Sequence, residues 1–174
     1  TSGTDLEIAG YYNGDVTVTG LTGQAEIIGI FIAGALTVSA KEVNASGLIS
    51  ANGAVSLTAQ ADGVYLGAGA LVESRSNAAV SITTSAGGDI IMGDRATIDT
   101  DGAISIITTG TDGDFELARI RGGAGSVTID VTGQVTDADT EISATKDVAN
   151  IVTSGALSIT ATGGIGEVSD RLDL

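Results

Sequence analysis

One short strand pattern occurs seven times along this sequence, and it constrains the fold more than any other feature. In most copies, two small residues are followed by an aliphatic residue, a hydroxyl residue, an aliphatic residue and usually a second hydroxyl residue. Apolar and polar residues therefore alternate with a period of two, which indicates a β-strand with one buried face. The copies are GDVTVTG (14–20), GALTVSA (34–40), GAVSLTA (53–59), AAVSITT (78–84), GAISIIT (102–108), GSVTIDV (125–131) and GALSITA (155–161).

The aliphatic positions of these copies define two rungs of an inward-facing ladder. The first rung contains Val16, Leu36, Val55, Val80, Ile104, Val127 and Leu157. The second contains Val18, Val38, Leu57, Ile82, Ile106, Ile129 and Ile159. Successive copies are 20, 19, 25, 24, 23 and 30 residues apart, a spacing that suits one coil of a β-solenoid.

Shorter apolar stretches between the copies indicate the remaining strands of each coil. GVYLGAGALVES (63–74) and DIIMGDRATIDT (89–100) align with each other, and 115–120 and 135–142 follow the same plan less closely. The long last step places an insertion at 137–149, which we expect to be a loop or a short helical turn. The richness in hydroxyl and β-branched residues favours strands over helices throughout.

Two all-β architectures fit these patterns. Asn-Gly and Asp-Gly pairs can form hairpin turns, as in an antiparallel β-sandwich. However, the pairs at Asn13, Asn52 and Asp101 all precede a copy of the repeated strand, as expected of a corner that recurs in every coil. A sandwich core also favours aromatic side chains, and this chain has three Tyr and two Phe. We therefore predict a parallel β-solenoid of about seven coils, with a β-sandwich as the alternative.

The sequence indicates one solenoid segment that covers residues 1–174. At about 4.8 Å per stacked strand, seven coils would form a rod on the order of 35 Å long. Each end would expose unpaired strand edges, so we expect flanking coils or identical neighbours to cover the ends. The chain begins at Thr1 without a leader. We therefore expect it to be part of a larger repetitive protein.

Composition excludes several classes of function. The chain has no His and no Cys, which removes imidazole chemistry, thiolate ligands and disulfides. Seven Lys and Arg against 22 Asp and Glu give a net charge of −15, so nucleic acid is not an expected partner. The longest apolar runs, such as 27–33, are much shorter than the roughly 18 residues of a membrane-spanning helix. Membrane insertion is not expected either.

Candidate chemical sites are few. The sequence suggests only one candidate cleft for a saccharide. It would be formed by the mixed charges at Asp94, Arg95, Asp99, Glu116, Arg119 and Arg121. Glycoside hydrolysis needs two carboxylates on opposite sides of the scissile bond, and sequence spacing does not reveal such a pair. Charge runs usually form a solvated face. We therefore predict a protein that is not an enzyme, with no catalytic, cofactor-binding or metal-ligating residue assigned.

Calcium is the one ion for which acidic stretches of this chain are candidates. Alternating acids occur at 99–101, 112–116 and 137–141. None of them has the twelve-residue loop with a terminal Glu that binds calcium in an EF-hand. We interpret them as acidic turns. Tyr11 and Tyr12 are adjacent in an expected strand, so we expect one to point outward and the other to be packed.

The strands of the GALTVSA type and the closing SGALSITATGGIG (154–166) resemble repeats of filamentous-haemagglutinin-like bacterial exoproteins. The resemblance covers most of the chain and implies a right-handed parallel β-helix that is secreted or anchored at the cell surface. It carries over no active-site residue. It favours a structural stalk segment of an adhesin, which could contact host or matrix glycans and proteins. A filament subunit that stacks end to end and a glycan-binding or carbohydrate-active β-helix are the alternatives.

Overall fold

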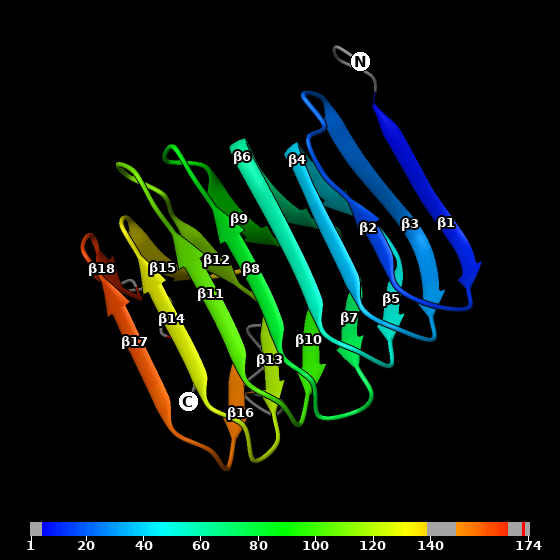
Figure 1. Cartoon of the computed structure of the whole chain (residues 1–174). Coiled ribbons are helices and arrows are strands. Elements are labelled where there is room, and N and C mark those ends of the chain that lie inside the picture. Colours follow the sequence, from blue (N-terminus) through cyan, green and yellow to red (C-terminus); the bar gives the residue numbers. More distant parts are fainter. Residues whose placement is uncertain (1–4, 139–148, 167–171, 173–174) are drawn as a thin grey trace.

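The computed structural model describes residues 5–138, 149–166 and 172, and these form a parallel β-solenoid of about six turns (Figure 1). The described part contains strands and no helix. Each turn contains three strand segments, which lie on three faces around one interior. Every described strand pairing is parallel, so the antiparallel sandwich alternative is wrong.

The repeated strands stack on one face, which we call the template face. It is formed by β2 (Val16–Val18), the first parts of β4 (Leu36–Ala45) and β6 (Val55–Leu66), β8 (Val80–Thr84), β11 (Ile104–Thr108), β14 (Val127–Val131) and β17 (Leu157–Ala161). Val16 pairs with Leu36, and the register then continues without a slip through every first-rung residue to Leu157. Both predicted rungs are thereby confirmed.

The other two faces follow the template face in each turn. The second face is formed by the first parts of β1 (Leu6–Tyr12) and β3 (Gln24–Ile32), the second parts of β4 and β6, β9 (Asp89–Met92), β12 (Phe115–Leu117), β15 (Gln134–Asp137) and β18 (Gly164–Ile165). The third face is formed by the second parts of β1 and β3, β5 (Leu48–Ala51), β7 (Leu71–Ser74), β10 (Thr97–Thr100), β13 (Arg119–Gly122) and β16 (Ile151–Thr153). The stretches 63–74 and 89–100 thus supply the second and third strands of their coils, as predicted.

The interior is narrow and is filled by small aliphatic side chains. Val, Ile, Leu and Ala dominate it, and Phe115 is its one aromatic residue among those described. Ladder residues of the middle coils, such as Leu57, Ile82 and Ile106, have no exposed surface. Such burial of aliphatic side chains stabilises the fold by roughly 1.5–3 kcal/mol for each Val, Leu or Ile.

Buried hydroxyl groups hold the corner between the third face and the template face. The Thr100 hydroxyl donates to the Ala78 carbonyl at 2.8 Å and accepts from the Gly102 amide at 2.9 Å. Ser74 donates to the Gly53 carbonyl in the same way at 3.0 Å. These bonds satisfy backbone groups that a tight turn leaves without a strand partner. The Asn-Gly and Asp-Gly pairs at 52–53 and 101–102 lie at this corner, as predicted.

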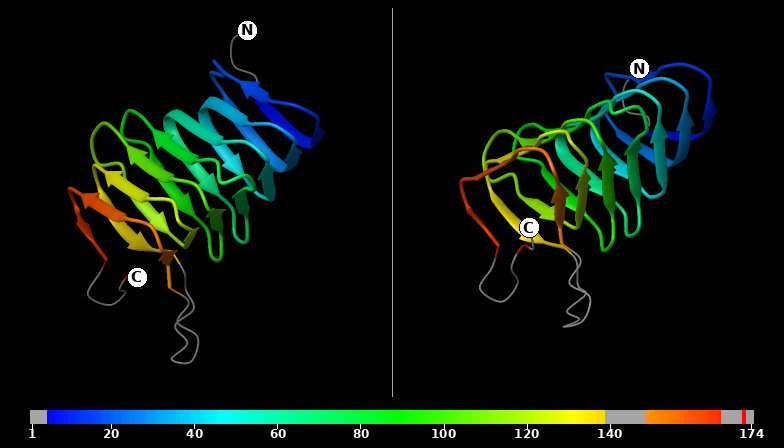
Figure 2. Two further views of the ribbon diagram at one scale, coloured as in Figure 1. Left: turned by 60° about the horizontal axis from the view of Figure 1, so that its bottom comes forward. Right: turned by 90° about the horizontal axis from the view of Figure 1, so that it is seen from below.

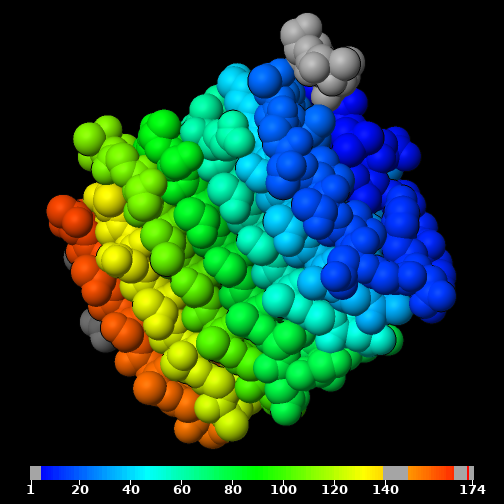
Figure 3. Space-filling view, viewed as in Figure 1, coloured from blue at the N-terminus to red at the C-terminus, as the bar shows by residue number. Residues whose placement is uncertain are grey.

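The coils follow one another in chain order from one end of the solenoid to the other. The two views in Figure 2 show the N-terminal and C-terminal coils at opposite ends of the stack. The surface in Figure 3 shows the same order as successive bands from blue to red. The insertion predicted at 137–149 lies mostly outside the described residues; Asp137 ends β15, and the description resumes at Ala149.

Candidate functional site

The outward side chains of the third face form one continuous column along the solenoid. Register pairs join Tyr11 to Phe31, then Ser50, Glu73, Asp99, Arg121 and Val152. The column changes from aromatic residues at the N-terminal end to charged residues in the middle. Two shallow hollows lie along it.

The N-terminal part of the column contains a cluster of Phe31, Ser50, Glu73 and Arg75, which we call the Arg75 cluster. Arg75 Nε lies 2.6 Å from Glu73 Oε1, and its guanidinium carbon lies 5.9 Å from the centroid of the Phe31 ring. The Ser50 hydroxyl donates to the same Glu73 oxygen at 2.5 Å. Ser50 is only 2% exposed although its strand position points outward. The cluster therefore ties together three successive coils.

Glu73 has a perturbed pKa because of these contacts. Partial burial by itself raises the pKa of this carboxyl group, but the hydrogen bonds from Ser50 and Arg75 and the positive charge of Arg75 outweigh it. The net result is a pKa below the ordinary value of 4.5. A hollow of about 160 Å³ next to the cluster is lined by Tyr11, Phe31, Ile32, Ala33, Ser50, Asn52 and Arg75.

The second hollow lies farther along the third face and contains part of the site that the sequence nominated. Its volume is about 380 Å³, and it is lined by Asp99, Asp101, Arg121, Gly122, Gly123 and Val152. Asp99 on β10 and Arg121 on β13 are direct register partners, so the structure brings these two predicted residues together. Arg119 lies on the same strand as Arg121 and is paired with Thr97.

The other predicted charged residues lie elsewhere. Glu116 is exposed on β12, which belongs to the second face, so the expected grouping with Arg119 and Arg121 is wrong for this residue. Asp94 and Arg95 occupy the corner that precedes β10, where Arg95 has a left-handed backbone with φ of 60°. Arg95 Nε lies 3.8 Å from Asp94 Oδ2. Sequence spacing did not reveal that a corner separates Glu116 from the two arginines.

The acids of the stretch 112–116, one of those considered for calcium, do not converge on a common point. Asp112 lies in a left-handed turn, Asp114 accepts a hydrogen bond from the Gln134 amide at 2.7 Å, and Glu116 points out from β12. The Asp114 carboxylate therefore links one coil to the next. Among the described residues no group of three or more acids is arranged to hold a metal ion. The stretch 137–141 lies outside the described residues from position 139 onward.

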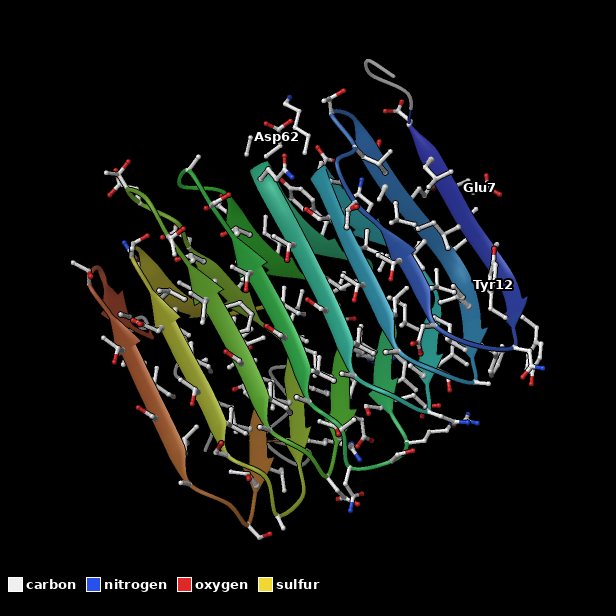
Figure 4. The ribbon with its side chains drawn as sticks, viewed as in Figure 1. Glu7, Tyr12 and Asp62 are labelled. Carbon is white, nitrogen blue, oxygen red and sulfur yellow. The ribbon has the colours of Figure 1, made fainter. Side chains whose placement is uncertain are left out.

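The expectation that one of the two adjacent tyrosines is packed is wrong. Tyr11 is 73% exposed and Tyr12 is 39% exposed. Tyr12 occupies an inward position on β1, but in the described structure no further coil stacks on the N-terminal edge of this strand. Its hydroxyl donates to the Ala9 carbonyl at 3.2 Å. Figure 4 shows Glu7 and Tyr12 on this terminal strand, and Asp62 at a corner, where its carboxylate lies 2.5 Å from Lys41 Nζ.

Both ends of the solenoid are open within the described residues. At the C-terminal end, the ladder residue Leu157 is 38% exposed, whereas its register partner Val127 is fully buried. Val152 and Ile165 on the same coil are 56% and 51% exposed. At the N-terminal end, Leu6 and Tyr11 on β1 are exposed as well. Leu6, Leu157 and Ile165 hold inward positions, whereas Tyr11 and Val152 belong to the outward column of the third face. The ends therefore present exposed apolar side chains next to unpaired strand edges.

No helix in the described part of the chain is long and apolar enough to span a membrane. Comparisons with protein-family models, with curated proteins and with solved structures found no match to this chain.

Proposed function

We propose that this chain is a structural stalk segment of a secreted or surface-anchored bacterial adhesin, not an enzyme. The observation that carries the proposal is the unbroken register of seven template strands, from Val16 to Leu157, between two open ends. A solenoid of this kind pairs only neighbouring coils, so its length can grow by one coil at a time. Such a rod can hold a binding region at a fixed distance.

The lateral surface also fits a spacer role. Several charged groups on it stabilise the stack, as shown by the Arg75 cluster and by the Asp114 link between coils.

The resemblance of the repeated strands to filamentous-haemagglutinin-like repeats supports the extracellular location. Antibodies raised against the folded chain should therefore label intact producing cells or detect the chain in their culture medium. Labelling only after lysis would contradict the location.

The stalk function can be tested by lengthening the rod. Residues 80–103 form one complete coil, because Val80 and Ile104 are register partners. Inserting three further copies of this coil before Ile104 should extend the molecule by about 14 Å, at 4.8 Å for each strand spacing. Small-angle X-ray scattering would measure the maximum dimension. An insert with the same composition in scrambled order is the control. A folded variant that grows in width instead of length would contradict the proposal.

Saccharide binding is a second candidate function, favoured by the hollow that contains Asp99 and Arg121. Adjacent carboxylate and guanidinium groups beside a shallow hollow can hydrogen-bond sugar hydroxyls. The variants Asp99→Ala and Arg121→Ala should each lose binding on a glycan array if this surface recognises a sugar. Asp130→Ala is the matched control, since Asp130 is an exposed acid on the template face. Unchanged binding in all three variants would exclude this hollow.

A further inference from the structure

We infer that the two open ends bind each other, so that a second copy of this chain stacks head to tail and continues the solenoid. The C-terminal end presents the edges of β16, β17 and β18, one on each face. The N-terminal end presents the edges of β1 and β2, which cover the same three faces and run in the same direction around the solenoid. A copy placed head to tail therefore offers a parallel strand to every open edge. A copy placed head to head would reverse the strand direction.

The register within the chain identifies the side chains that would meet. The column that begins at Leu6 ends at Ile165, so these two exposed aliphatic residues would become neighbours. The column that begins at Tyr11 ends at Val152. On the template face, Val16 would stack on Leu157. Each of these contacts joins apolar side chains that are now partly or largely exposed.

The backbone hydrogen bonds between coils would also continue from one copy to the next. The amide of each first-rung residue donates to a carbonyl of the following coil, for example Ile104 to Ser126 at 2.8 Å and Val127 to Ala156 at 2.8 Å. Leu157 holds this position in the last coil, so its amide is directed out of the C-terminal end. The register places the Asp15 carbonyl of the second copy in line with it. Copy-to-copy stacking would thus satisfy backbone groups that the end of the rod leaves open.

The distribution of charge supports this interface. The net charge is −15, yet no charged residue occurs from Ala149 to Gly166. At the other end, Asp15 is the only charged residue from Ile8 to Ala25. Exposed sheet edges are usually protected by charged residues or proline, whereas the centres of protein interfaces are depleted in charge. The chain has no proline. Leu172 packs partly buried against the core but leaves Val152, Leu157 and Ile165 exposed.

Disulfide trapping tests the proposed register directly, because the natural chain has no cysteine. The double variant Tyr11→Cys and Val152→Cys places one thiol at each end of the molecule. In the stacked pair, these positions would be adjacent strand neighbours, about 4.8 Å apart and within the range of a disulfide. Oxidation should yield a ladder of covalent oligomers on a non-reducing gel. The control Ile28→Cys with Val152→Cys, which uses an exposed residue of the second coil in place of Tyr11, should give none.

Charge substitutions provide a second test that does not depend on oxidation. The first variant carries Leu6→Lys, Tyr11→Lys, Val152→Lys and Ile165→Lys. The second variant carries Leu6→Lys, Tyr11→Lys, Val152→Glu and Ile165→Glu. Head-to-tail stacking brings like charges together in the first variant and opposite charges together in the second. Sedimentation velocity should show at least a tenfold weaker association for the all-lysine variant than for the mixed variant. Circular dichroism would establish that both retain β-structure.

The outcomes separate this inference from the stalk function. A natural chain that remains monomeric over a wide concentration range, with no disulfide ladder, would overturn end-to-end stacking. The stalk function would stand, because the coil-insertion experiment does not depend on association. Equal association of the two charge variants would also overturn the register given above. Homodimers that stop at two chains would indicate head-to-head contact, which likewise contradicts it.

Discussion

At the scale of single residues, the fold depends on which face of a strand a side chain occupies. Ile106 is fully buried in the ladder, whereas Ile107 points outward between Thr83 and Asp130 of the adjacent coils. Ile106→Asp would bury an unpaired carboxylate and should lower the free energy of unfolding by several kcal/mol, on the order of 3–5. Ile107→Asp, one position along, should cost less than about 1 kcal/mol. Urea denaturation of both variants checks the assignment, and equal losses would contradict it.

Glycine is required where coils approach most closely. A Cβ atom at Gly125 would overlap the Gly102 carbonyl of the preceding coil, and this backbone has no room to move aside. Gly125→Ala should therefore destabilise the chain by about 2 kcal/mol or more. A Cβ at Gly29 meets no atom within 4 Å, so Gly29→Ala should be close to neutral. Thermal unfolding of the two variants measures the difference, and identical melting temperatures would show that the coils are less closely stacked.

At the scale of elements, the Arg75 cluster connects β3, β5 and β7. The pKa of Glu73 is lowered in the folded state, so its contribution to stability is present above the unfolded pKa. It is lost as the pH falls below 4.5 through the folded pKa. Glu73→Gln should lower stability at neutral pH by up to about 1 kcal/mol and reduce the loss in acid. Glu116→Gln, at an exposed residue of β12, is the control. Denaturation curves across this pH range would contradict the role if both variants matched the natural chain.

The sequence was most informative where one face of a strand is buried. Strict alternation located both rungs, because a shift of one residue would move every aliphatic side chain to the surface. The same alternation could not locate Glu116 relative to Arg121, since this depends on a corner that the pattern does not mark. Thr84 and Ser74 were indistinguishable from outward hydroxyls, yet both are buried and bond to turn carbonyls. The expectation that one of the two tyrosines is packed was wrong because alternation gives the direction of a side chain and does not tell whether a neighbouring coil covers the strand.

At the scale of the whole molecule, stability should vary along the stack. Inner coils have neighbours on both sides, whereas β1, β2 and β16 to β18 have a neighbour on one side only. Hydrogen exchange should therefore be slowest in β6, β8, β11 and fastest in the terminal strands of the isolated chain. Mass spectrometry of exchanged peptides would measure this gradient. If copies stack end to end, protection of β17 should rise with protein concentration while that of β8 stays constant. Uniform exchange along the chain would contradict nearest-neighbour stability.

Because the hydrogen bonds between coils run along the rod, a force that pulls its two ends apart stretches these bonds. A coil that detaches from its neighbour and unfolds releases 104 − 80 = 24 residues, the separation of the register partners Val80 and Ile104. Fully extended, this length reaches about 80 Å, at 3.3–3.6 Å per residue, whereas the folded coil contributes about 4.8 Å to the rod. A stalk built in this way would lengthen more than tenfold at each yielding coil. Its coils would unfold one after another under load, and each unfolding event would dissipate part of the applied mechanical energy.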